Sequence, residues 1–185
     1  MSKIIAGMSV SLDGFVNDAS GSVEKLFPDF TALHDVPSFK EMIANTGAVI
    51  MGRNVYQMAD PFEWASDDYE FQTPIFVLTH KAPDKYPPGN GKLSFTFVTD
   101  GIESAVSQAK KAAGGKDVQV IGANTIQQLL NAGLCDELQI DVIPVLLGKG
   151  VRMFDHLDHE VKLERVKTEE TTKERTTLTF RVVKN

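Results

Sequence analysis

The chain of 185 residues carries 19 Lys and Arg against 25 Asp and Glu, a formal net charge of −6. This acidic balance argues against a general nucleic-acid binder, which needs excess positive charge to displace phosphate counterions. Cys135 is the only cysteine, which excludes an intrachain disulfide, a CxxC redox pair and a multi-cysteine zinc site. Length and composition predict one domain over residues 1–185. Because no signal peptide and no apolar run of about 18 residues is found, we expect a soluble, cytoplasmic protein without a membrane partner.

Five short apolar segments predict the strands of a parallel sheet. Each is rich in β-branched or aromatic residues and is bounded by turn residues, which is typical of strands buried on both faces. The predicted strands cover residues 3–10, 47–51, 74–79, 95–98 and 118–121.

Three amphipathic helices are predicted between these strands, from apolar residues spaced three and four apart. The first is centred on residues 39–43. The second is predicted to begin with Asp100 as its N-cap and to end at Gly114. The third is predicted to begin with Asn124 as its N-cap and to end at Gly133.

The pattern of the last third of the chain is antiparallel. Residues 137–145 predict one more strand, and residues 176–182 alternate between polar and apolar with period two. Residues 161–167 can pair with that strand through the polar stretch 168–173, as an antiparallel hairpin. The whole pattern predicts an α/β three-layer domain with a mostly parallel sheet of about eight strands, helices on both faces and a C-terminal antiparallel hairpin.

Glycine and polar residues follow three of the predicted strands, at the sheet edge where ligands bind in open α/β folds. The Arg53 guanidinium offers a planar fork for a phosphate, and a helix start after the fifth strand offers free N–H groups for a pyrophosphate. Each junction alone is explained nearly as well by a solvated turn or a tight helix start. Three of them on one edge indicate a site for a phosphate-rich dinucleotide. The residues are Gly52, Arg53 and Asn54 after the second strand, Thr79, His80 and Lys81 after the third, and Ile121, Gly122, Ala123, Asn124 and Thr125 after the fifth.

Other kinds of chemistry have less support. The segment 89–92 (GNGK) lacks the following Ser or Thr that binds magnesium in a phosphate loop, and no predicted strand precedes it. His156 and His159 lie beside two aspartates in a turn-like stretch and not on a helix face, so no metal site is predicted. Trp64 is interpreted either as an aromatic packed under a loop or as a lid over a flat substrate ring.

Three ordered blocks resemble the dihydrofolate reductase-like superfamily, and most closely the RibD C-terminal family, the reductase domain of riboflavin biosynthesis. The first block is residues 8–14 (MSVSLDG) and the second is residues 48–56 (AVIMGRNVY). The third combines the glycine junction at 120–123 (VIGA), the stretch 129–138 (LLNAGLCDEL) and the stretch 144–150 (PVLLGKG). The resemblance covers nearly the whole chain and implies the largely parallel sheet that is predicted independently.

The resemblance implies an NADPH-dependent reductase that transfers a hydride to a small pteridine- or aminopyrimidine-type substrate. It places Asp13 in the loop between nicotinamide and substrate, and we hypothesise that either Asp13 or Asp35 contacts the substrate. Turn or helix capping is at least as good an explanation for Asp35. Phe15, Phe39 and Trp64 are expected to wall a flat apolar slot. The resemblance assigns to the cofactor Gly14, Gly52, Arg53, Asn54, Thr79, His80, Ile121, Gly122, Ala123, Asn124 and Thr125.

The sequence departs from the family pattern on the substrate side. Phe15 stands where riboflavin-precursor reductases usually carry Lys, and Ile121 stands where they usually carry an acidic residue. Folate-reducing enzymes hold the pterin with a carboxylate on the first helix, for which Asp35 and Glu41 are the nearest candidates. An alternative therefore stays open: a non-catalytic protein that kept the fold to bind a nucleotide or a small planar ligand. A homodimer is also expected, paired through the C-terminal strands and residues 144–150, as family members often are.

Overall fold

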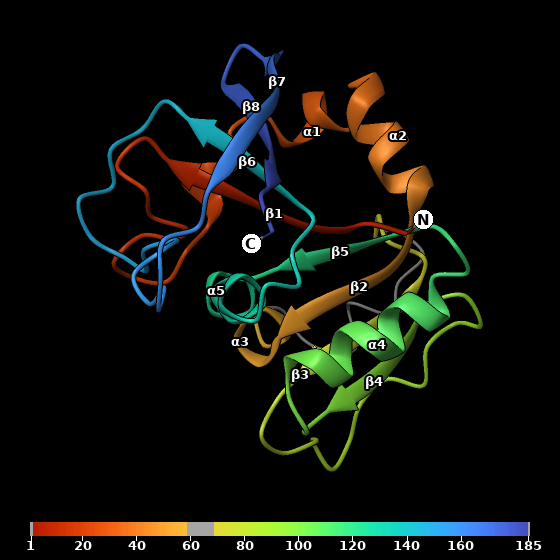
Figure 1. Cartoon of the computed structure of the whole chain (residues 1–185). Coiled ribbons are helices and arrows are strands. Elements are labelled where there is room, and N and C mark those ends of the chain that lie inside the picture. The colour runs from red at the N-terminus through yellow and green to blue at the C-terminus, as the bar shows by residue number, and fades with distance from the viewer. Residues whose placement is uncertain (1, 59–68, 185) are drawn as a thin grey trace.

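The computed structural model describes residues 2–58 and 69–184 (Figure 1). Eight strands form one sheet in the order β4-β3-β2-β5-β1-β6-β8-β7. Neighbouring strands from β4 to β6 are parallel, and β8 runs antiparallel to both β6 and β7. The predicted α/β sheet with a C-terminal antiparallel hairpin is therefore confirmed. The strands are β1 (Ile4–Ser11), β2 (Thr46–Gly52), β3 (Pro74–Leu78), β4 (Ser94–Val98), β5 (Asp117–Ile121), β6 (Glu137–Ile143), β7 (Leu163–Thr172) and β8 (Arg175–Val182).

Helices cover both faces of the sheet, and the predicted three are present as α2, α4 and α5. The single-turn helices α1 and α3 and the 3₁₀ turn η1 were not expected, because three or four residues are too few to show a helical period. Helices α4 and α5 contact β2 and β5 and lie together on one face (Figure 1). The helices are η1 (Glu24–Leu26), α1 (Phe30–Leu33), α2 (Pro37–Asn45), α3 (Arg53–Tyr56), α4 (Ile102–Ala112) and α5 (Ala123–Asn131).

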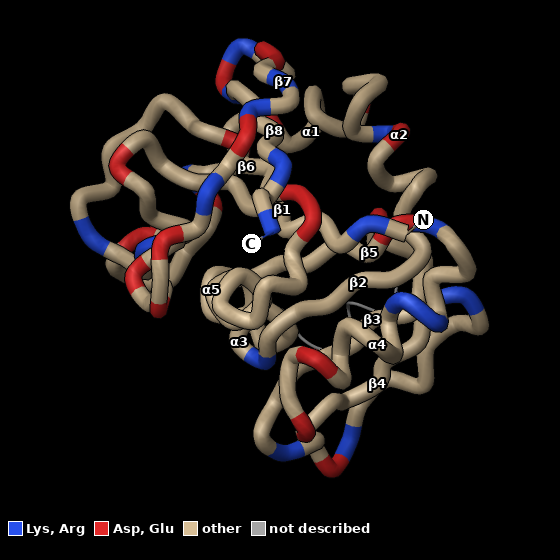
Figure 2. The backbone as a smooth tube through the Cα atoms, viewed as in Figure 1, with Lys and Arg blue, Asp and Glu red and all other residues tan. Residues whose placement is uncertain are grey.

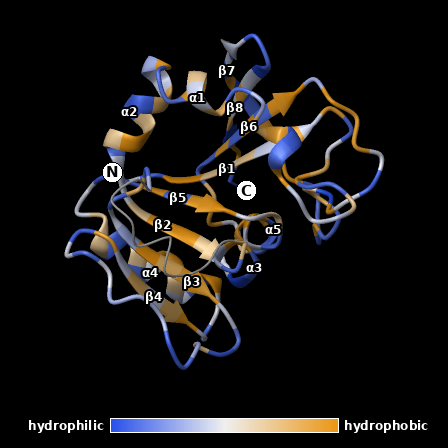
Figure 3. Cartoon of the chain, turned by 180° about the vertical axis from the view of Figure 1, so that it is seen from behind, coloured by the Kyte–Doolittle hydropathy of each residue, from blue (hydrophilic) through white to orange (hydrophobic). Residues whose placement is uncertain are grey.

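Alternation along the buried strands divides the core into two clusters. In β2, Ala48 and Ile50 pack into the cluster under α4 and α5, whereas Val49 and Met51 pack into the cluster on the opposite face. Tyr56 of α3 belongs to that second cluster. Seen from behind, the central strands are hydrophobic and the β7–β8 hairpin is mostly hydrophilic (Figure 3). Charged residues likewise gather on the hairpin and the outer loops (Figure 2).

The predicted N-caps of α4 and α5 are wrong, because glycines occupy both positions. Gly101 and Gly122 are the N-cap residues, with φ of 106° and 98°, and neither helix has a side-chain cap hydrogen bond. Positive φ lets the chain turn sharply from strand into helix, which a capping Asp or Asn does not require. Asn124 lies inside the first turn, where its Oδ1 accepts a hydrogen bond from Gln128 Nε2 at 2.6 Å.

The hairpin is longer than predicted. Residues 168–173 were expected to form its turn, but β7 continues to Thr172, which pairs with Arg175. Only Lys173 and Glu174 remain in the turn. The threonines of this stretch favour extended backbone, which explains why a polar sequence continues the strand. Within the described residues, no helix is long and apolar enough to cross a membrane.

Candidate functional site

The strand ends that the sequence singled out meet at one place, where the β2–α3 and β5–α5 junctions pack against each other. A Cβ on Gly52 would lie 2.6 Å from Thr125 Oγ1, and a Cβ on Gly122 would lie 2.8 Å from Val55 Cγ2. Gly122 also needs its positive φ of 98°. Both positions therefore require glycine, and the predicted Gly52 and Gly122 turns form a single surface.

The start of α5 at this surface is suited to an anion. Ala123 and Thr125 are buried, while Asn124 is exposed. The N-cap residue is a glycine without a side chain, and among the described residues no side-chain cap bonds the N–H groups of the first turn. The Gly122 N–H itself donates to Met8 Sδ at 3.2 Å. Unpaired N–H groups and the positive end of the helix dipole favour phosphate at such a terminus.

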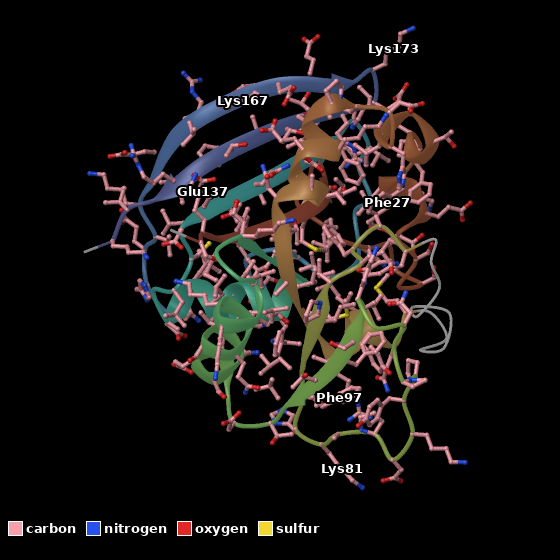
Figure 4. All side chains as sticks on the ribbon, turned by 90° about the vertical axis from the view of Figure 1, so that its right-hand side faces the viewer. Phe27, Lys81, Phe97, Glu137, Lys167 and Lys173 are labelled. Carbon is pink, nitrogen blue, oxygen red and sulfur yellow. The ribbon has the colours of Figure 1, made fainter. Side chains whose placement is uncertain are left out.

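A pocket of about 230 Å³ lies beside this surface, at the carboxyl ends of β2 and β3. Arg53 follows β2, whereas Thr79, Lys81 and Asp84 follow β3. Arg53 and Lys81 bring positive charge to the wall of the pocket, and Asp84 adds one carboxylate. The Thr79 hydroxyl donates to the Lys81 carbonyl at 3.0 Å, which holds this turn. Tyr56 and Phe97 supply an aromatic wall, with ring centroids 5.3 Å apart. Figure 4 shows Phe97 and Lys81 at the same end of the molecule.

His80, the other cofactor-binding candidate of this turn, is exposed and is not among the residues that line the pocket. Lys81 lines it instead. Sequence alone does not tell which of two neighbouring residues faces a pocket once the strand has ended, because the turn geometry decides it.

Asp13 holds a loop with both of its carboxylate oxygens. Its Oδ1 accepts hydrogen bonds from Ser11 Oγ at 2.6 Å and from the Leu147 N–H at 3.0 Å. Its Oδ2 accepts from the Gly148 N–H at 2.7 Å. The Ser11 hydroxyl, together with these two N–H groups, lowers the pKa of Asp13 to about 2. Asp13 therefore stays ionised at neutral pH and ties the loop after β1 to the loop after β6.

The same two loops are joined along their backbones. The Leu12 N–H donates to the Val145 carbonyl and the Val16 N–H donates to the Val151 carbonyl, both at 2.9 Å. Between them the buried ring of Phe15 lies under the Arg152 guanidinium, whose carbon is 4.5 Å from the ring centroid. Gly14, with a φ of 84°, accepts from the Met153 N–H at 3.0 Å. The paired loops form one unit at the carboxyl edge.

The remaining predicted substrate residues lie around α1 and α2. The Asp35 side chain is 86% exposed and pairs with Lys40 Nζ at 3.3 Å. It does not cap α2, whose N-cap residue is Val36. Phe39 is half-buried and meets the His34 ring edge-to-face at 5.3 Å. Trp64 lies outside the described residues.

The sequence analysis missed a buried arginine with two acidic partners. Arg175, at the start of β8, binds Asp29 in a bidentate ion pair, with Nε donating at 3.0 Å and Nη2 at 2.8 Å. Its Nη1 donates to Asp141 Oδ2 of β6 at 3.0 Å and to Ser9 Oγ of β1 at 2.7 Å. Its Nη2 also reaches the Leu26 carbonyl at 3.2 Å. The guanidinium thus joins β1, β6 and β8 to the segment before α1.

Asp29, and not Asp35 or Glu41, is therefore the buried carboxylate at the first α-helix. Burial opposes its ionisation, but hydrogen bonds from Arg175 and Thr172 outweigh burial and lower its pKa. Burial raises the pKa of Asp141, against hydrogen bonds from Thr177 and Arg175 that lower it. The sequence does contain a signal for this ion pair, because Arg175 begins a strand whose residues alternate with period two. An arginine that faces the core from such a strand needs acidic partners.

Comparisons with known proteins agree with this architecture. Residues 2–177 match the family model of the RibD C-terminal domain. The uncharacterized protein YyaP of Bacillus subtilis (strain 168) is 26% identical over 171 residues, which cover 90% of this chain and 87% of that protein. A crystal structure named "Putative riboflavin biosynthesis protein", from Shewanella sp. PV-4, is 25% identical with a TM-score of 0.75, over 98% of this chain and 99% of the other.

Dihydrofolate reductase from Enterococcus faecalis, solved with NADP(H), is similar in fold, with a TM-score of 0.62 at 19% identity over 97% of this chain and 96% of the other. The fold is thus that of the dihydrofolate reductase-like proteins, as the sequence resemblance implied. The family match extends over nearly all of the sheet and both junctions of the site. The chain belongs to the family of RibD C-terminal domains.

Proposed function

We propose that this protein is an NADPH-dependent reductase that transfers a hydride to a small pteridine- or aminopyrimidine-type substrate. One observation carries the proposal: the pocket at the ends of β2 and β3 brings Arg53 and Lys81 together beside the uncapped start of α5. Two separate places for phosphate groups on one sheet edge match a dinucleotide with a third phosphate. The match to the RibD C-terminal domain and the similarity in fold to dihydrofolate reductase support the same proposal.

The residues present fit this cofactor. Arg53 and Lys81 would hold the phosphate that distinguishes NADPH from NADH, since a guanidinium and an ammonium both donate charge-assisted hydrogen bonds. The N–H groups at the start of α5 would hold the pyrophosphate, and the glycines at 52 and 122 let the two junctions pack into the single surface on which it would lie. Bound there, NADPH supplies the hydride.

Asp13 in this proposal is a positioning residue. Its ionised carboxylate holds the Leu147 and Gly148 N–H groups, and so keeps the paired loops closed over the carboxyl edge. With a pKa of about 2 it is not a proton donor at neutral pH. The proton that accompanies the hydride would then reach the substrate from water or from another acid.

A second function, a non-catalytic nucleotide or planar-ligand protein, is favoured by one specific observation. Asp13, which the resemblance places between nicotinamide and substrate, and Asp29, the buried carboxylate at the first α-helix, are both bound within the protein. Neither carboxylate is left to activate a substrate. Cofactor binding is common to both functions, whereas turnover separates them.

The test begins with NADPH and NADH titrations of the wild type, Arg53→Ala and Lys81→Ala. Each variant should bind NADPH about tenfold more weakly and NADH nearly unchanged, because each loses one charge-assisted contact to a single phosphate. Lys111→Ala is the matched control, since Lys111 is exposed in the last turn of α4, a helix that runs back from the carboxyl edge. Equal weakening of both nucleotides would contradict the phosphate assignment.

Turnover is then measured as oxidation of NADPH with pterins and with aminouracil ribosyl phosphates as acceptors. Oxidation with either class supports the reductase. Tight NADPH binding without oxidation by any acceptor supports the non-catalytic function instead. Absence of NADPH binding overturns the proposal.

A further inference from the structure

Arg175 has one more carboxyl group beside it than its own charge balances. Asp29 already forms a bidentate ion pair with the guanidinium, and its side chain is 3% exposed. Asp141 accepts from Arg175 Nη1 at 3.0 Å, and its side chain is 21% exposed. Within the described residues, no other Lys, Arg or His bonds to either carboxyl group. One guanidinium between two largely buried carboxylates leaves one negative charge unbalanced, and binding a proton removes that charge.

The surroundings favour this proton on Asp141 and not on Asp29. Burial opposes ionisation of Asp29, but hydrogen bonds from Arg175 and Thr172 outweigh burial and lower its pKa. At Asp141 burial outweighs the hydrogen bonds from Thr177 and Arg175 and raises the pKa, and the nearby charge of Asp29 adds to the rise. The two carboxyl groups that share one cation are therefore different: Asp29 is the anion of the ion pair, and Asp141 is the acid.

A chain of hydroxyl groups leads from Asp141 to the C-terminal hairpin, across the neighbouring strands β6, β8 and β7 (Figure 1). Thr177 Oγ1 of β8 lies 2.7 Å from Asp141 Oδ1 and 2.5 Å from Thr171 Oγ1 of β7. Thr177 is buried, whereas Thr171 is partly exposed. A hydroxyl group both donates and accepts, so the two bonds can run toward an Asp141 carboxylate or away from an Asp141 acid. A chain that accepts both directions can pass a proton from its outer to its inner end.

An irregularity in β7 gives Thr171 its place in this chain. The register of β7 against β8 shifts beside Thr171, and a bulge of this kind turns a side chain away from its regular direction. The regular cross-strand partner of Thr177 is Glu169, whose carboxylate is paired with Lys167 at 2.6 Å. The bulge thus brings an uncharged hydroxyl group to Thr177, beside a charge that is already neutralised.

Asp141 also lies next to the loops at the carboxyl edge of the sheet. It is two residues before Ile143, the end of β6, and is level with the uncharged Ser9 of β1. The two strands lead directly into the paired loops that Asp13 joins. In the cluster of Arg175 and its two carboxyl groups, Asp141 is the member with an appreciably exposed side chain. Its open side therefore adjoins the candidate site, and the hydroxyl chain approaches from the hairpin side.

We propose that Asp141 is the proton donor of this protein and that Thr177 and Thr171 return a proton to it. The inference rests on the proposed function and identifies the acid that accompanies hydride transfer. Asp141 loses the proton of its O–H bond to the nitrogen of an acceptor C=N bond, whose carbon takes the hydride as NADPH is oxidised to NADP⁺. The carboxylate then takes a proton from Thr177, Thr177 takes one from Thr171, and Thr171 takes one from water. A bound acceptor excludes water from the open side of Asp141, so the return path runs through the hairpin.

Infrared spectroscopy of the whole chain tests the proton on Asp141 without turnover. An ordinary aspartate, with a pKa of about 3.9, is ionised at about pH 6. We expect the wild type to show the C=O band of a protonated carboxyl group at this pH, and Asp141→Asn to lack it. Asp155→Asn, at an exposed aspartate, is the control and should keep the band. Identical spectra of the wild type and Asp141→Asn would overturn the inference.

Steady-state oxidation of NADPH tests the donor role. Asp141→Asn should lower kcat about a hundredfold or more, the usual contribution of a general acid, and leave the dissociation constant of NADPH unchanged. The kcat of the wild type should fall as pH rises, because only the protonated carboxyl group donates, and Asp141→Asn should lose this dependence. A pH profile shared by the two proteins would contradict the donor role.

The hydroxyl chain is tested by variants that leave Asp141 and Arg175 in place. Thr177→Val and Thr171→Val should lower kcat by about tenfold, less than loss of the acid itself, and raise the ratio of kcat in H₂O to kcat in D₂O. Thr177→Ser keeps the hydroxyl group and should restore both values. Thr179→Val is the matched control, on the same face of β8 but outside the chain. Wild-type kcat and isotope ratio in Thr177→Val would overturn the inference.

Failure of this inference and failure of the reductase proposal are distinguishable. If the wild type and Asp141→Asn oxidise NADPH at the same rate with an acceptor, the inference fails and the reductase proposal stands. If the carboxyl band is present but NADPH is not oxidised with any acceptor, the reductase proposal fails and takes the donor role with it. The proton on Asp141 then serves only to balance the charge beside Arg175.

Discussion

At the scale of single residues, two charged side chains, Asp13 and Arg175, are held by backbone groups and by other side chains. Asp13 uses three hydrogen bonds to join two loops, and Arg175 uses all of its nitrogens to join three strands to the segment before α1. Such groups stabilise one arrangement of the chain, because losing a single partner leaves a charge or an N–H without compensation.

Asp13→Asn should lower turnover strongly while leaving NADPH affinity nearly intact. An amide accepts with one oxygen only, so either the Leu147 or the Gly148 N–H loses its acceptor and the loop opens. Steady-state kinetics and cofactor titration measure the two effects. Asp155→Asn, at an exposed aspartate, is the control. An equal loss of turnover and cofactor affinity would refute the positioning role.

The pH dependence of the same loop follows from the lowered pKa of Asp13. The folded form favours the ionised carboxylate, so its hydrogen bonds contribute fully above the ordinary pKa of 3.8 and are lost as pH falls through about 2. The amide proton resonance of Gly148, followed by NMR, should therefore titrate with a midpoint near 2. A midpoint at the ordinary value for aspartate would show that the carboxylate is not held by the loop.

Arg175→Met should reduce the free energy of unfolding by about 3–5 kcal/mol, the cost of leaving buried carboxylates without their cation. Urea denaturation measures the change. Arg165→Met, at an exposed position of the neighbouring strand β7, should change it by less than about 0.5 kcal/mol. Similar values for the two variants would show that Asp29 and Asp141 are solvated rather than paired.

At the scale of elements, the two strand-to-helix junctions depend on each other. The β2–α3 turn leaves room for Thr125 because position 52 has no side chain, and the β5–α5 turn leaves room for Val55 because position 122 has none. The proposed cofactor surface is therefore a product of packing between turns about 70 residues apart in the sequence, and a change in one turn moves the other.

Gly122→Ala should destabilise the protein by about 1–3 kcal/mol and weaken NADPH binding, because it adds both left-handed strain and a Cβ 2.8 Å from Val55. Gly114→Ala is the matched control: its φ of 60° is also left-handed, but no atom lies within 4 Å of the added Cβ. Denaturation and NADPH titration of the two variants separate packing from strain. Equal effects on both would contradict the close contact of the two junctions.

At the scale of the whole molecule, the sheet ends on one side in a long exposed strand. The first six residues of β7, 163–168, are all exposed, and they include the apolar residues Leu163 and Val166. An exposed edge strand offers unpaired backbone groups to a second chain. The predicted homodimer through the C-terminal strands is therefore kept as a proposal, with β7 as its contact.

Light scattering should give twice the 20.3 kDa mass of one chain at micromolar concentration. Val166→Lys should shift the protein toward the monomer, because it replaces an exposed apolar side chain of the edge strand by a charge. A wild-type monomer would refute the proposal. A variant that dimerises as the wild type does would remove β7 as the contact.

The sequence by itself determined the sheet and its principal helices, because strand alternation and helical spacing are local patterns of single side chains. It also indicated Gly52, Arg53, Thr79 and Gly122, since the end of a parallel strand is visible as the end of an apolar run. The helix caps were predicted wrongly because Gly101 and Gly122 act through backbone conformation, which side-chain chemistry does not reveal.

Only the tertiary structure decided which of these residues meet. Arg175 and Asp29 are 146 positions apart, and no local pattern links them. Periodicity reports which face of a strand a residue occupies, but the order of strands in the sheet sets which distant residues become neighbours on that face.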